Sequence, residues 1–84
     1  MQITFKLFAT LTDYLPAASH HTNIVALDVA PDASILQIIE PFGLPSNLVH
    51  LVLVNGKYIH PADRATQTLN AGDVLAIWPP IAGG

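Results

Sequence analysis

Apolar residues occupy every second position at the start of the chain, where Ile3, Phe5 and Leu7 alternate with polar side chains. Successive side chains of a strand point to opposite faces of its sheet, so this period of two predicts a half-buried strand over 2–8. The same alternation predicts a second strand over 24–29. Because the two strands are close in the sequence, we expect them to pair in antiparallel fashion.

Apolar residues with helical spacing follow in the middle of the chain. Ser34 or Asp32 can cap the start of this helix with a side-chain oxygen that accepts a backbone N–H. Pro41 lacks the N–H that a helix interior needs, so the regular helix is expected to end near Glu40. Its apolar face comprises Ile35, Ile38, Ile39 and Phe42.

Turn and proline signals delimit the remaining elements. Asn55-Gly56 directly follows an apolar run and is a strong signal for a two-residue hairpin turn. Pro79-Pro80 ends the last apolar run, because proline cannot donate to a strand ladder. Together these signals predict a short helix over 9–15 and strands over 48–54, 57–59 and 74–78.

The composition limits what such a chain can do. Its 84 residues suffice for a single α+β domain over 1–84, with little room for a deep catalytic cavity beside a core. Hydrophobic residues make up 51% of the chain and charged residues only 11%. Part of the apolar surface is therefore expected to be exposed, which favours a domain that docks on other proteins.

Charged residues are few, and they are not clustered. The cations are Lys6, Lys57 and Arg64, and the net charge is −3. Nucleic-acid binding needs clustered Lys and Arg that displace counterions from phosphates, so we predict no nucleic-acid partner. We interpret the three cations as solvated surface charges that are available to acidic patches on partners. The acidic residues show no pairing that suggests general acid–base catalysis.

Metal and thiol chemistry find no support in the residue pattern. Cysteine is absent, which excludes disulfides and thiolate sites. His20 and His21 are adjacent and point in opposite directions on an extended segment. His50 and His60 flank the predicted hairpin, but no third ligand has a convincing spacing. We therefore predict no metal site.

The sequence carries no sign of a membrane or secretory address. No apolar stretch approaches the roughly 20 residues that span a bilayer. The first residues lack the basic region and long apolar core of a signal peptide. We therefore expect a cytoplasmic protein with no membrane partner.

The chain stops at Gly83-Gly84, shortly after the stiff pair Pro79-Pro80. Two residues without a Cβ atom can pass through a slot that side chains would block. The carboxylate of Gly84 is ionised at neutral pH and is a poor electrophile, so it reacts only after a partner activates it. These features divide the chain into a globular body over 1–78 and an extended functional tail over 79–84. An idle flexible end stays an alternative interpretation.

Residues around the tail are candidates for contacts with that partner. The two prolines have a fixed φ, which reduces the entropy lost when the tail enters a pocket. Ile81 can anchor in an apolar groove. Phe8 and Trp78 can form a docking patch with it, although core packing is a competing interpretation for both aromatic residues. The candidate partner-binding residues are Phe8, Trp78, Pro79, Pro80, Ile81 and Ala82.

Four segments carry a family pattern in a fixed order along the whole chain. They are Ile3-Thr4-Phe5-Lys6-Leu7-Phe8-Ala9, Val52-Leu53-Val54-Asn55-Gly56, Leu69-Asn70-Ala71-Gly72-Asp73-Val74 and Trp78-Pro79-Pro80-Ile81-Ala82-Gly83-Gly84. In this order they resemble the MoaD/ThiS family of ubiquitin-like sulfur carriers. The resemblance implies a ubiquitin-like β-grasp, in which a mixed sheet of four to five strands packs on one main helix and a flexible Gly-Gly tail follows. It leans towards the small subunit of molybdopterin synthase, since thiamine-pathway carriers are usually shorter.

The resemblance also implies a chemistry for the tail. An adenylating enzyme of the ubiquitin-activating type would use ATP to form an acyl-adenylate at Gly84. A persulfide on a sulfur donor protein would then displace AMP and leave a thiocarboxylate. Gly83 and Gly84 would be the reacting end of a carrier that serves the catalytic large subunit of molybdopterin synthase. The chain itself would bind no cofactor and would catalyse nothing alone.

Other functions share parts of this pattern. A carrier for thiamine or another sulfur-transfer pathway would use the same tail. A ubiquitin-like modifier would be adenylated in the same way and then joined to lysines of target proteins through Gly84. A regulatory or interaction domain would leave the glycines idle, and only this last function would survive the deletion of Gly84.

Overall fold

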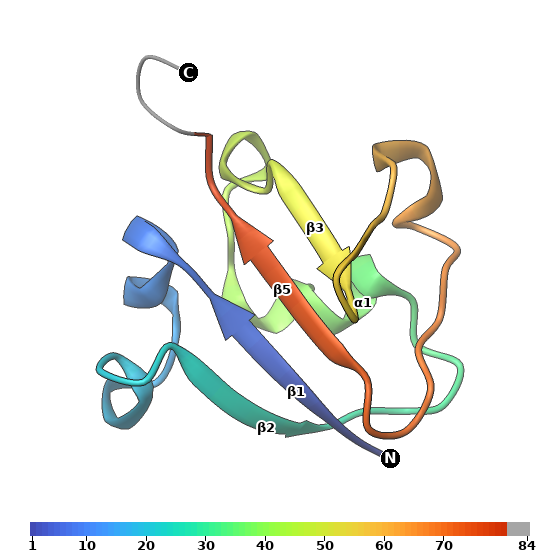
Figure 1. Ribbon diagram of the computed structural model, residues 1–84, viewed down its shortest axis with the longest axis horizontal. Coiled ribbons are helices and arrows are strands. Elements are labelled where there is room, and N and C mark those ends of the chain that lie inside the picture. Colours follow the sequence, from blue (N-terminus) through green and yellow to red (C-terminus); the bar gives the residue numbers. More distant parts are fainter. Residues whose placement is uncertain (81–84) are drawn as a thin grey trace.

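A five-stranded mixed sheet packs on one main helix in the computed structural model, which describes residues 1–80 (Figure 1). Its strands are β1 (Gln2–Leu7), β2 (Ile24–Asp28), β3 (Leu51–Val54), β4 (Lys57–Tyr58) and β5 (Val74–Trp78). The helix α1 (Ile35–Ile39) lies behind the sheet in the view of Figure 1. Short 3₁₀ helices span Ala9–Tyr14, Ala17–Ser19, Glu40–Phe42, Ser46–Leu48 and Pro61–Asp63.

Strand β5 occupies the middle of the sheet, whose order is β2-β1-β5-β3-β4. It runs parallel to β1, with Leu75 opposite Phe5, and antiparallel to β3, with Ile77 opposite Val52. The predicted antiparallel pairing of β1 with β2 is confirmed. A mixed sheet of this order on one helix is the ubiquitin-like β-grasp that the sequence predicted.

The core lies between the sheet and α1. The alternation at the start of the chain puts Ile3, Phe5 and Leu7 on this inner face, where each is at most 2% exposed. The central strand contributes Leu75 and Ile77, which are fully buried. The helix and the loops complete the core with Leu11, Leu15, Ile35, Ile38, Ile39, Val52, Val54, Ile59 and Leu69.

Capping bonds hold the start of α1, which is only five residues long. The Ser34 hydroxyl accepts from the Gln37 backbone N–H at 3.2 Å, and the Gln37 side chain accepts from the Ser34 N–H at 2.9 Å. This reciprocal pair is a capping box. The N–H of Leu36, in the first turn of α1, donates to the Arg64 carbonyl, which lies in a loop far away in the sequence. A helix this short depends on such caps and on packing, because its own propagation contributes little.

The predicted hairpin turn at Asn55-Gly56 is confirmed, with φ of +52° and +82° at the two residues. The Asn55 side chain also bonds to the start of the central strand. Its Oδ1 accepts from the Val74 N–H, and its Nδ2 donates to Asp73, each at 2.9 Å. The turn between β3 and β4 is thereby fastened to β5.

Three predicted elements differ in the structure. The helix predicted over 9–15 is a 3₁₀ helix over Ala9–Tyr14, whose start has no side-chain cap of the kind that holds α1. The strand predicted over 48–54 begins at Leu51, because Pro45 leads into a 3₁₀ helix over Ser46–Leu48. The short return strand is likewise limited to Lys57–Tyr58.

Replacing Ser34 by Ala should lower the free energy of unfolding by about 1 kcal/mol, the typical cost of losing an N-cap. Urea denaturation followed by circular dichroism measures this change. Ser46→Ala is the matched control, since Ser46 is exposed and caps no α-helix. Equal stabilities for the Ser34→Ala and Ser46→Ala variants would contradict the importance of the capping box.

Candidate functional site

The tail leaves the sheet at the end of β5, where the chain on both sides holds the backbone. On the β1 side, the Phe8 N–H donates to the Ile77 carbonyl at 3.2 Å. On the β3 side, the His50 N–H donates to the Trp78 carbonyl at 3.2 Å. We call the segment 78–80 the tail root. It is therefore held by hydrogen bonds up to its first residue.

The packed part of the chain continues one residue beyond the strand. Pro79 is buried and Pro80 is exposed. The predicted contact residues Ile81 and Ala82 and the predicted reacting residues Gly83 and Gly84 lie outside the described residues 1–80. Their roles stay predictions, and the structure describes only the tail root that precedes them.

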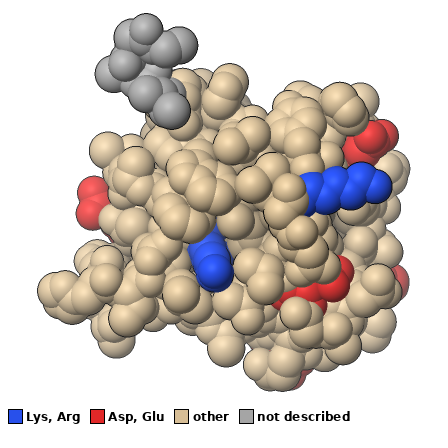
Figure 2. Space-filling view, in the orientation of Figure 1, with Lys and Arg blue, Asp and Glu red and all other residues tan. Residues whose placement is uncertain are grey.

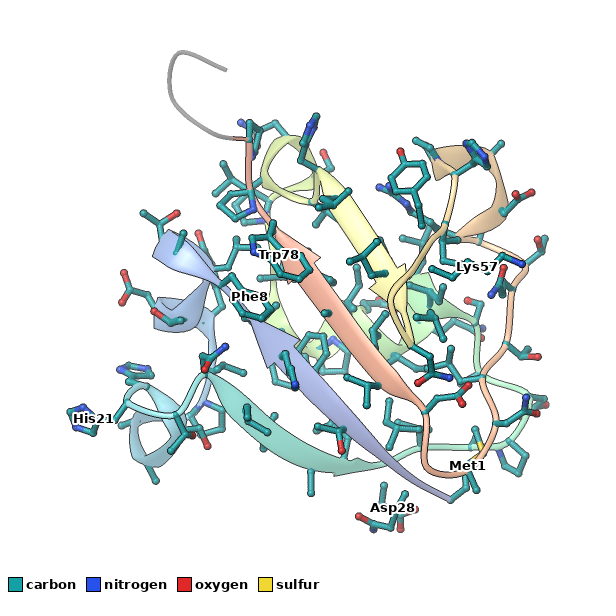
Figure 3. The ribbon with its side chains drawn as sticks, in the orientation of Figure 1. Met1, Phe8, His21, Asp28, Lys57 and Trp78 are labelled. Atoms are coloured by element: carbon teal, nitrogen blue, oxygen red, sulfur yellow. The ribbon has the colours of Figure 1, made fainter. Side chains whose placement is uncertain are left out.

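Phe8 and Trp78 stack on one another beside the tail root. Their ring centroids are 4.0 Å apart and their planes differ by 2°. Figure 3 shows the two side chains together over the ends of β1 and β5. Both are half-buried, and neither belongs to the core or to the apolar residues packed against it. They therefore lie on the outer surface, and their part in partner binding stays a prediction.

The outer face of the sheet, which points away from α1, is apolar over most of its strands. Residues directly opposite one another in a sheet share a face. Leu51 lies opposite Trp78, and Leu53 lies opposite both Ala76 and Tyr58. Figure 2, which views this side, shows few charged atoms. We call this surface the open sheet face, formed by Phe8, Ile24, Leu51, Leu53, Tyr58, Ala76 and Trp78.

One cation lies within the open sheet face. Lys6 is half-buried and stands opposite Ile24 on β2 and Ala76 on β5. The other lysine, Lys57, is exposed beside the hairpin turn. A partner that covers the open sheet face must therefore accommodate an ammonium group among apolar side chains.

The interpretation of Arg64 as a solvated surface charge is wrong. Its side chain is only 5% exposed. Its guanidinium donates from Nε to the Ile59 carbonyl, and from Nη1 and Nη2 to the carbonyls of Val49 and His50, at 3.1–3.2 Å. Within residues 1–80, no carboxylate forms an ion pair with it. Backbone carbonyls replace the water that a buried charge loses.

The histidines form no metal site within residues 1–80. Within the described part of the chain, no three His, Asp or Glu side chains come together to hold a metal ion. The His60 ring meets the Tyr58 ring edge-on at 5.1 Å. Nε2 of His20 lies 2.7 Å from the Leu15 carbonyl oxygen, within hydrogen-bond distance. Within the same residues, no helix is long and apolar enough to cross a membrane.

Sequence reasoning missed the strand residues of the open sheet face. The apolar run over 48–54 predicts a strand but does not separate its two faces. Leu51 and Leu53 alternate with Val52 and Val54, and this period of two is the signal that could have found them. Both pairs of residues are apolar, so a pattern of alternating polar and apolar residues does not reveal which pair faces outward.

Comparisons with known proteins agree with this geometry. A model of the family described as Mut7-C ubiquitin matches residues 1–82. The crystal structure of SAMP1 from Haloferax volcanii is 28% identical, with a TM-score of 0.70 and coverage of 100% of both chains. The Haloferax volcanii HVO 2177 protein is 24% identical, with a TM-score of 0.75 over 100% of this chain and 87% of that chain.

A third solved structure extends the likeness in fold. A Pyrococcus furiosus protein described as a candidate molybdopterin converting factor, subunit 1, is 17% identical, with a TM-score of 0.68. The match covers 96% of this chain and 99% of that chain. Among curated proteins, no sequence matches significantly.

The β-grasp body and these comparisons define a small ubiquitin-like protein. The chain belongs to the Mut7-C ubiquitin family. The predicted resemblance to ubiquitin-like carriers of the MoaD/ThiS type is confirmed by this family match and by the likeness to SAMP1. The Pyrococcus furiosus structure adds support for the fold alone.

Replacing Phe8 by Ala should expose the indole of Trp78 to water. Trp78 is the only tryptophan of the chain, so its fluorescence reports on the tail root alone. The emission should shift to longer wavelength and acrylamide quenching should increase, while the free energy of unfolding falls by about 0.5–1.5 kcal/mol. Tyr58→Ala, on the same face but over β4, is the control. An unchanged emission spectrum in Phe8→Ala would show that the two rings do not stack in solution.

Proposed function

We propose that this protein is a sulfur carrier whose Gly84 carboxylate is adenylated by a partner enzyme and converted to a thiocarboxylate. The observation that carries the proposal is the tail root. Hydrogen bonds from Phe8 and His50, on the two sides of the central strand, hold the chain up to Trp78. Pro79-Pro80 follows at the rim of an apolar surface. The membership of a ubiquitin-like family and the likeness to SAMP1 support it.

The body and the tail have separate tasks in this proposal. The open sheet face docks on the partner, since exposed apolar patches are the usual sites of protein association. Four residues follow Pro80, and an extended chain advances about 3.3–3.6 Å per residue. The tail therefore reaches a reactive centre that lies beneath the partner's surface. Gly83 and Gly84 pass through the narrowest part because they have no side chains.

The chemistry follows from the weak reactivity of a carboxylate. An oxygen of the Gly84 carboxylate attacks the α-phosphate of ATP, which releases pyrophosphate and leaves an acyl-adenylate. A persulfide sulfur attacks the acyl carbon and expels AMP, and a thiol then cleaves the S–S bond to leave the thiocarboxylate. Each step is easier than direct exchange of oxygen for sulfur, which is the general advantage of covalent intermediates. The chain supplies the acyl group, and the partners supply ATP and sulfur.

Molybdopterin synthesis is the pathway that we propose first. The fold is shared with a protein described as a candidate molybdopterin converting factor subunit. The partners would be an adenylating enzyme, a sulfur donor protein and the catalytic large subunit of a synthase. Because the first step consumes ATP, we place the protein in the cytoplasm.

A ubiquitin-like modifier is the second candidate. The likeness to SAMP1, described as a small archaeal modifier protein, specifically favours it. The adenylation step is the same, but the acyl group is then transferred to the amino group of a lysine on a target protein. An isopeptide bond replaces the thiocarboxylate as the product that identifies this function.

The intact mass of the protein, purified from its native host without reducing agents, should include a species in which one oxygen is replaced by sulfur. Deleting Gly84 should abolish this species. Protein coupled through Gly84 to lysines of other proteins, with no sulfur-containing species, would instead support the modifier. If neither product forms in the presence of the adenylating enzyme, ATP and a sulfur source, both proposals fail.

Leu53→Ser should weaken docking of the body on its adenylating enzyme without altering the tail. We expect the KM for the carrier to rise about tenfold, equivalent to roughly 1.4 kcal/mol, with kcat unchanged. ATP–pyrophosphate exchange measures both constants. The matched control is Leu36→Ser, because Leu36 is an exposed leucine on α1, behind the sheet. Equal KM values for the two variants would remove the open sheet face from the proposal.

A further inference from the structure

The buried arginine and the tail root are joined through one peptide group. The Val49 carbonyl accepts from Nη1 of Arg64 at 3.2 Å. The N–H of the same peptide group, that of His50, donates to the Trp78 carbonyl at 3.2 Å. A hydrogen-bonded chain therefore runs from the guanidinium, through the Val49–His50 peptide, to the carbonyl at which the tail begins.

Polarisation strengthens such a chain. A charged donor on the carbonyl end of an amide draws electron density towards the oxygen and makes the N–H a better donor. The effect is larger where water is excluded, and the Arg64 side chain is only 5% exposed. The charge of Arg64 thus strengthens the bond between the His50 N–H and the Trp78 carbonyl.

The last bond in the chain orients the tail. The Trp78 carbonyl belongs to the planar peptide group that joins Trp78 to Pro79. Holding this oxygen fixes the plane of that peptide group, and the proline ring then fixes φ at the next residue. The direction in which the chain leaves the sheet is set at this peptide.

Two further bonds from the same guanidinium hold the segment that carries the donor. Nη2 of Arg64 donates to the His50 carbonyl at 3.1 Å, and Nε donates to the Ile59 carbonyl at 3.1 Å. The planar guanidinium therefore links the carbonyls of Val49 and His50 to the carbonyl of Ile59, in the segment after β4. Lysine, with a compact ammonium group, cannot reproduce this planar arrangement of donors.

We propose that Arg64 is a positioning residue for the tail, which it aims through the Val49–His50 peptide. This inference rests on the proposed activation of Gly84, because only an enzyme that captures the tail makes use of its direction. Arg64 does not touch the tail in this account, and its contact with the open sheet face is the ring of Tyr58, whose centroid lies 5.8 Å from the guanidinium carbon. Its loss should lower the rate of activation and leave docking unchanged.

The first experiment measures the hydrogen bond itself in the full-length protein by NMR. Scalar coupling across the bond between the His50 nitrogen and the Trp78 carbonyl carbon should be present in the wild type. It should weaken or vanish in Arg64→Lys, with faster hydrogen exchange of the His50 amide. His50→Ala is the control, since it removes an exposed side chain and keeps the peptide group. Wild-type coupling in Arg64→Lys would overturn the proposal.

The second experiment separates positioning from general stability. We expect Arg64→Lys to lower kcat for adenylation of Gly84 about tenfold, because small misplacements of a reacting group are costly. The KM should stay at the wild-type value, because Arg64→Lys keeps a positive charge beside Tyr58 and changes no residue of the open sheet face. A merely structural role would lower the amount of folded protein, measured by circular dichroism, and leave kcat per folded molecule unchanged.

Two further controls keep the outcomes distinct. Arg64→Met removes the charge entirely, and if it fails to fold, Arg64→Lys carries the test. If the adenylating enzyme activates neither wild type nor variant, the proposed function fails while the NMR coupling still decides whether Arg64 controls the tail root. If the wild type is activated and Arg64→Lys matches it in both constants, the positioning role is wrong.

Discussion

The pairing of β5 on both of its edges is the interaction on which the rest of the structure depends. β1 and β3 each bind this strand along its length, in parallel and antiparallel register respectively. The core side chains Leu75 and Ile77, the apolar outer surface and the point where the tail leaves all belong to this strand. A strand that is paired on both edges opens less readily than an edge strand. The tail therefore follows one of the most stable elements of the domain, strand β5.

A second constraint is the scarcity of charge. A domain of 84 residues has a large surface for its volume, and here apolar residues form the inner face of the sheet and much of its outer face. One face is sealed by α1 and the loops, whereas the other remains accessible. The buried Arg64 shows how the protein handles one of its few cations, since three backbone carbonyls from two segments surround the guanidinium. These bonds connect loops that the small core alone would hold weakly.

The sequence predicted the sheet and the main helix well because strong local signals specify them. The alternation at Ile3, Phe5 and Leu7, the turn at Asn55-Gly56 and the cap at Ser34 each dictate a local geometry that tertiary packing did not alter. The β-grasp arrangement came from family resemblance. The burial of Arg64 could not be predicted, because it depends on contacts with segments far away in the chain. The late start of β3 has a local cause, the 3₁₀ helix after Pro45, which the apolar run from Leu48 conceals. For the candidate site, Phe8 and Trp78 were identified from their types, while their stacking required the register of β1 and β5.

The two prolines after Trp78 also restrict how another protein can approach the tail root. Neither residue carries a backbone N–H, so a partner cannot extend the sheet there by adding a strand that alternates donors and acceptors. Recognition by β-strand addition, in which an extended peptide pairs with the edge of a sheet, is blocked for these two positions. The same feature hinders self-assembly through the tail root, since a strand ladder between copies cannot pass through consecutive prolines.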